Sequence, residues 1–136
     1  MLSSILSHPS FLRAVLWFDA ATGVLLGALH LLLTEPLADW LGLPAGLLQV
    51  SGAMLFGYAV LAAALARSRP VPRGWLWVLI AGNLGWALAS LLLWTGFAVL
   101  PTFWGQAYLL VHVVSVALLA ELQWFGVRRL PALAAA

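Results

Sequence analysis

Two acidic side chains and one amide, Asp19, Glu121 and Asn83, interrupt long apolar stretches of this sequence. An acidic side chain near the centre of a bilayer costs about 2.5–3.5 kcal/mol on insertion scales. Such a group is expected to face other helices and to be hydrogen-bonded or protonated. Because intramembrane acids are common elements of ligand sites and proton relays, these residues are the first candidates for a functional site.

Helical spacing predicts which side chains accompany them, because residues three or four apart lie on one face of a helix. Asn83 shares a face with Trp86 and Ser90. Counting from the helix ends that carry arginines, at about 1.5 Å per residue, places Tyr58 level with Asn83 and Glu121 about a turn shallower. The predicted ligand or proton site has these members: Asp19, Tyr58, Asn83, Trp86, Ser90 and Glu121.

Two interpretations of this cluster stay open. In one, it is a site on the arginine-bearing side that binds a small ligand or carries a proton. In the other, Asp19 and Asn83 form a hydrogen bond that fixes helix register, and Glu121 reaches water near the arginines. Because both acids lie in the same half of their spans, the structural interpretation is the first expectation. In the last apolar segment, the residues predicted to face the interior of the bundle are Gln106, Leu110, Val113, Ala117 and Glu121.

Histidine offers a second possible chemistry, because two imidazoles on different helices can hold a haem iron. His30 lies near the outer end of its apolar segment, and residue counting places His112 nearly two turns deeper. We therefore expect neither haem nor metal, and no cofactor. No Ser-His-acid arrangement is brought together by the expected topology, so catalysis has little support. The chain has no cysteine, which excludes disulfides and thiol chemistry.

The elements that must position these residues are membrane-spanning helices. The sequence is 65% hydrophobic and 7% charged, whereas soluble domains are about 45–50% apolar and about 25% charged. We predict an all-α fold, a single transmembrane four-helix bundle over residues 1–136 with spans at 11–33, 45–66, 74–95 and 103–125. A short interfacial helix is expected within 34–44, where Pro36 suits a first turn and Gly42 an end. Residues 1–10 are expected to form a cytoplasmic or interfacial lead-in.

All six arginines fall on one side of this arrangement. Three lie in the Pro-containing segment 67–73, and the others are Arg13, Arg128 and Arg129. Short loops rich in Arg face the cytoplasm, which predicts that both termini are cytoplasmic. No basic stripe with interleaved aromatic residues lies away from these ends, so nucleic acid is not an expected partner.

Small residues at four-residue spacing predict close helix packing. They occur as Gly23 and Gly27 in the first span and as Ala59 and Ala63 in the second. A third row, in the third span, consists of Ala81, Gly85 and Ala89. Ordinary packing within one chain is expected rather than a dedicated dimer face.

Several short motifs resemble a family of uncharacterised small bacterial integral membrane proteins with four spans. They include Asp19 early in the first span, Leu-Ala-Asp-Trp-Leu-Gly-Leu-Pro at 37–44, Asn83 with Trp86 and Ser90, and Gly-Gln-Ala at 105–107. The resemblance implies fold and the bacterial inner membrane, without an activity. We expect a non-enzymatic accessory subunit or small-ligand-binding bundle in the lipid bilayer, either as a homo-oligomer or within a larger membrane complex. Alternatives are a proton-linked transporter or channel-like oligomer and an enzyme acting on a lipid-soluble substrate.

Overall fold

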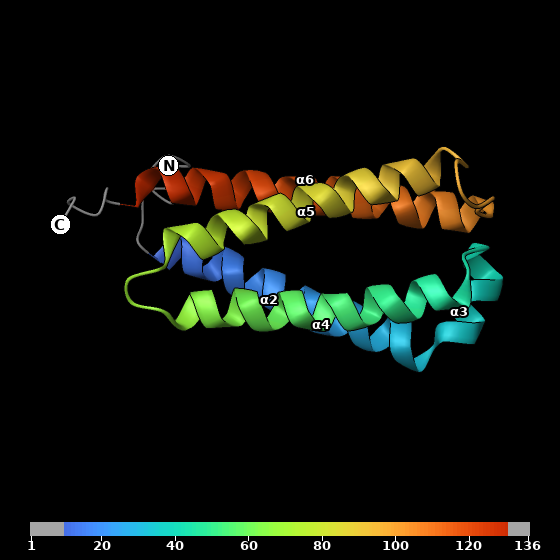
Figure 1. Cartoon of the computed structure of the whole chain (residues 1–136), viewed down its shortest axis with the longest axis horizontal. Coiled ribbons are helices and arrows are strands. Elements are labelled where there is room, and N and C mark those ends of the chain that lie inside the picture. Colours follow the sequence, from blue (N-terminus) through green and yellow to red (C-terminus); the bar gives the residue numbers. More distant parts are fainter. Residues whose placement is uncertain (1–9, 131–136) are drawn as a thin grey trace.

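The computed structural model describes residues 10–130, so most of the predicted lead-in segment lies outside the described residues. The chain is all-α, as predicted. The elements are α2 (Ser10–Leu32), α3 (Thr34–Leu41), α4 (Ala45–Arg67), α5 (Arg73–Trp94) and α6 (Phe103–Arg129). Successive long helices run antiparallel along one axis (Figure 1). Each of the four is long and apolar enough to cross a membrane. The protein is a multi-pass membrane protein with a short helix, α3, between the first two spans.

The helix ends follow local sequence chemistry. Gly42 ends α3 in the left-handed conformation, with φ of 67°, which is accessible to glycine at little cost. Thr102 precedes α6 and accepts a hydrogen bond from the Gly105 N–H through its side chain. That bond satisfies one of the backbone donors that a helix start leaves unpaired.

The bundle consists of two closely packed helix pairs. Helix α2 packs along α4, and α5 packs along α6, while α4 and α5 touch each other little. A Cβ atom on Gly23 would lie 3.2 Å from the Cβ of Ala59, and one on Gly27 would lie 3.0 Å from the carbonyl oxygen of Gly52. The GxxxG row of α2 therefore packs within the chain, in agreement with the expectation.

The third small-residue row behaves differently. Ala81, Gly85 and Ala89 are exposed, and a Cβ atom on Gly85 would meet nothing within 4 Å. No helix of the described chain packs closely on this row. The two pairs consequently remain apart along the α4–α5 side.

Two apolar cores hold the pairs together, one toward each end of the bundle. The core at the arginine-bearing end includes Leu16, Leu76 and Val127, all fully buried. The other is built around Leu41 and Leu48, near α3. The residues that line the hollow middle of the bundle come mostly from between these two cores.

The arginines gather at one end of the structure. The Arg13 guanidinium donates to the carbonyl oxygen of Ser68 at 3.2 Å, which ties the start of α2 to the loop after α4. The Arg67 guanidinium lies 5.4 Å from the ring centre of Trp17, and that of Arg128 lies 4.1 Å from the ring centre of Trp124. Such cation–π contacts suit the boundary between lipid and water.

Candidate functional site

Asp19 and Asn83 meet in the structure, as the sequence predicted, and Gln123 completes the cluster. The Asn83 amide donates to Asp19 Oδ2 at 3.2 Å and to Gln123 Oε1 at 3.1 Å. The Gln123 amide donates to the same Asp19 oxygen at 2.5 Å. The exposed fractions of Asp19, Asn83 and Gln123 are 9%, 5% and 0%. A closed set of three hydrogen bonds therefore links α2, α5 and α6.

The prediction of which residues of α6 face the interior of the bundle is wrong. Glu121 is exposed, as are Gln106 and Leu110, whereas Leu109, His112 and Gln123 are buried. Two positions along a helix correspond to about 200° of rotation, so Glu121 and Gln123 point to nearly opposite sides. One signal could have identified Gln123, namely its position three helical turns from His112 and therefore on the same face.

Tyr58 does not form a hydrogen bond to this cluster in the described residues. Its phenol ring packs directly on Gly82 of α5, where an added Cβ atom would overlap the Tyr58 hydroxyl group. Only glycine at position 82 leaves room for this placement of Tyr58. The tyrosine thus crosses the space between the two helix pairs, a short distance from Asp19 along the bundle.

The two membrane histidines lie together, contrary to the prediction that they differ in depth. The ring centres of His30 and His112 are 6.4 Å apart, with an angle of 26° between the planes. The reason is α3, which continues beyond the end of α2 (Figure 1). The Thr102 N–H and hydroxyl donate to the carbonyl oxygens of Leu41 and Trp40. Because α6 starts at the far end of α3, its third turn lies level with the last turn of α2.

The hydrogen bonds around His30 determine which of its ring nitrogens donates and which accepts. The Ser51 hydroxyl donates to the Leu48 carbonyl at 3.0 Å, so its oxygen accepts from His30 Nδ1 at 2.8 Å. The other ring nitrogen, Nε2, then accepts from the Tyr108 hydroxyl. His30 is in this way fully satisfied and fixed in position.

His112 has one satisfied and one unsatisfied ring nitrogen. Its Nδ1 lies 3.1 Å from the Tyr108 carbonyl oxygen, which can only accept, so Nδ1 carries the hydrogen. Its Nε2 is buried and has no hydrogen-bond partner within residues 10–130. His112 is 7% exposed. Buried polar atoms are nearly always paired, so this orphan acceptor points to a partner other than the described residues.

Two cavities occupy the middle of the bundle. The α4–α5 cavity has a volume of about 380 Å³ and lies behind the row of Gly85 and Ala89. The α2–α6 cavity, on the other side, has a volume of about 650 Å³ and reaches Asp19 and Asn83. Both volumes lie in the range of small-molecule sites, roughly 300–1,000 Å³. The two cavities share these lining residues: Tyr58, Gly82, Trp86, Tyr108 and His112.

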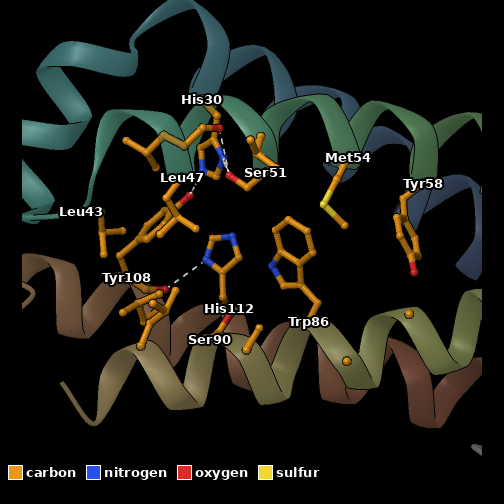
Figure 2. Close-up of a pocket in the computed structure, with 17 residues that line it drawn as sticks. His30, Leu43, Leu47, Ser51, Met54, Tyr58, Trp86, Ser90, Tyr108 and His112 are labelled. Carbon is orange, nitrogen blue, oxygen red and sulfur yellow. Dashed lines mark hydrogen bonds between the residues drawn. The ribbon is translucent and has the colours of Figure 1, made fainter. Parts of the chain in front are cut away.

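The predicted site residues distribute over these cavities as follows. Trp86 lines both, Ser90 is buried against the α4–α5 cavity, and Asp19 lines the α2–α6 cavity. Glu121 lines neither of these two cavities. Figure 2 shows Trp86, His112 and Ser90 converging in the space between the two helix pairs.

Metal-binding geometry is not found in the part of the chain that the structure describes, where no three His, Asp or Glu side chains form a possible metal site. No protein-family model, curated protein or solved structure matches the chain. The family suggested by the short motifs is therefore not identified, and four membrane-length helices are what the findings support. Any function must be argued from the geometry of the bundle.

Proposed function

We propose that this protein binds a small, largely apolar molecule in the paired cavities at the centre of its bundle. The observation that carries the proposal is the hollow itself, because lipid-facing helices normally pack closely through small residues. Here a small-residue row on α5 is left without a helix partner, and two of its members, Gly85 and Ala89, form part of a cavity wall. This arrangement favours a ligand-binding bundle over an accessory subunit.

The rims of both cavities suit entry from the bilayer. Val50 and Met54, on the wall of the α4–α5 cavity, are 61% and 50% exposed. Phe18 and Val111, on the wall of the α2–α6 cavity, are 61% and 63% exposed. In a membrane these side chains contact lipid tails, so an apolar molecule can pass between the helices without crossing water.

The position of the arginines supports an orientation with the 67–73 loop in the cytoplasm. The resemblance of the short motifs suggests the inner membrane of a bacterium. In that orientation the Asp19 cluster lies in the cytoplasmic half of the bundle and the histidine pair in the outer half. The α2–α6 cavity then runs between the two polar groups, since it reaches both Asp19 and His112.

A cavity-filling variant tests the binding proposal. In Gly85→Leu the new side chain is expected to extend into the α4–α5 cavity, because Gly85 lines this cavity and nothing lies within 4 Å of its Cβ position. Gly57→Leu is a matched control, since Gly57 is exposed on α4, has equally open surroundings and lines neither of these cavities.

The protein is purified in nanodiscs from its native host, and small molecules in an organic extract are quantified by mass spectrometry. We expect the wild type and Gly57→Leu to carry one species in near-stoichiometric amount, and Gly85→Leu to lose most of it. Retention by Gly85→Leu, or a wild type that carries only bulk phospholipid, contradicts the proposal.

A second candidate function is proton-linked transport, favoured by one observation: Asp19 and His112 line the same cavity. Titratable groups spaced along a membrane interior are the usual elements of proton relays. In liposomes that contain a pH-sensitive dye, this function requires a proton flux that Asp19→Asn abolishes while the bundle stays folded. Equal fluxes for the wild type and for empty liposomes contradict it.

A further inference from the structure

Two residues that line both cavities, His112 and Trp86, each have a ring nitrogen without a hydrogen-bond partner in residues 10–130. His112 Nε2 is the acceptor, because its ring hydrogen is on Nδ1 and is used by the Tyr108 carbonyl. The indole N–H of Trp86 can only donate, and it has no hydrogen-bond partner within residues 10–130. Figure 2 shows the nitrogen-bearing edge of Trp86 turned toward the ring of His112.

We propose that this pair recognises a hydroxyl group, and that the ligand is an apolar molecule with an alcohol or phenol at one end. A hydroxyl group donates one hydrogen bond and accepts others, so it can give its hydrogen to His112 Nε2 and accept from the Trp86 N–H. This inference rests on the proposed binding function and adds the chemical class of the ligand.

A carbonyl group and an ammonium group fit the pair less well. A carbonyl group can only accept, so it would leave His112 Nε2 buried and unpaired, which is costly. An ammonium group can only donate, and it would leave the indole N–H unpaired. The remainder of the ligand is apolar, because leucine, valine and glycine make up much of both cavities beyond this wall.

The polar groups near the pair hold it in place. His112 is fixed by the Tyr108 carbonyl, and the Tyr108 hydroxyl is held in turn by His30, which is anchored on Ser51. The hydroxyl hydrogen of Tyr108 is used by His30, so it does not compete with a ligand for His112 Nε2. A fixed acceptor lowers the ordering cost of binding.

The test compares two probes, 4-hexylphenol and its methyl ether, 4-hexylanisole, in which a methyl group replaces the hydroxyl hydrogen. Binding to the full chain in nanodiscs is measured by equilibrium dialysis against empty nanodiscs. We expect the phenol to bind the wild type about tenfold more tightly than the ether, the effect of one net hydrogen bond. In His112→Phe, which keeps a planar ring, the two probes should bind equally.

A spectroscopic readout makes the test independent of whether His112→Phe folds. In protein labelled with ¹⁵N-histidine, the phenol should shift the Nε2 resonance of His112, and the ether should not. Trp86→Phe removes the donor and should weaken both probes, while Trp75→Phe, at an exposed position outside the cavities, serves as the control.

Each outcome separates the two proposals. Equal affinity of the two probes for the wild type, with both lost in Gly85→Leu, overturns hydroxyl recognition and leaves cavity binding in place. If neither probe binds the wild type above empty nanodiscs, both proposals are overturned. A phenol preference that persists in His112→Phe also contradicts the assignment to His112.

Discussion

Replacing Asn83 with leucine is expected to destabilise the bundle, because it breaks two of the three hydrogen bonds in the Asp19–Asn83–Gln123 cluster. Hydrogen bonds between membrane helices contribute about 0.6 kcal/mol on average and at most about 1.7. Two such bonds amount to roughly 1.2 kcal/mol, and Asp19 also loses one of its two donors. We expect Asn83→Leu to lose about 1–2 kcal/mol of unfolding free energy.

The same reasoning predicts that the losses are not additive. Removing one partner leaves buried polar atoms unpaired, whereas replacing all partners with apolar side chains leaves none. The triple variant Asp19→Leu/Asn83→Leu/Gln123→Leu is therefore expected to unfold within about 0.5 kcal/mol of the wild type. It should be more stable than Asn83→Leu alone.

The assay is reversible unfolding in mixed micelles with increasing mole fraction of sodium dodecyl sulfate, followed by near-UV circular dichroism. Gln106→Leu is the matched control, an exposed amide on α6 outside the cluster, and should leave stability nearly unchanged. The reasoning is refuted if Asn83→Leu is as stable as Gln106→Leu, or if the triple variant loses the sum of the three single losses.

Further predictions concern helix packing, capping and topology. Gly27→Leu should cost about 1–3 kcal/mol in the same assay, because its Cβ would lie 3.0 Å from the Gly52 carbonyl oxygen; an unchanged midpoint would show that α2 and α4 can separate freely. Thr102→Val should cost about 1–2 kcal/mol, since it removes the cap of α6 and the bond to α3; a loss below about 0.5 would contradict this. Because the chain has no cysteine, Gly74→Cys and Ala98→Cys report topology cleanly. An impermeant maleimide applied to intact spheroplasts should label only Ala98→Cys, and the reverse pattern would overturn the proposed orientation.

Sequence reasoning was most successful for features that depend on how deep a residue lies in the membrane. The length and apolar character of the four segments predicted the helices, and residue counting brought Asp19 and Asn83 to one level, where they form a hydrogen bond. Counting failed for His30 and His112, because it assumed that all helices end at a common plane. The anchoring of α6 on α3 through Thr102 shifts the start of that helix outward.

It was much harder to predict which side of each helix faces the interior of the bundle. Glu121 was expected inside and is exposed, while Gln123 was overlooked and is fully buried. In a water-soluble bundle the apolar stripe of a helix marks its inner face. In a bilayer, lipid tails are as apolar as the protein interior, so leucine and valine occur on both faces and the pattern carries little information.

The sequence by itself determined that this chain crosses a membrane four times, with its arginines at one end and acidic groups within the spans. These features depend on the cost of placing each residue type at a given depth, which is a local property. Only the tertiary structure decided that two helix pairs remain apart and that a ring nitrogen of the cavity-lining His112 is buried without a partner in residues 10–130. Those features depend on the rotation and offset of helices relative to one another, which contacts between distant residues determine.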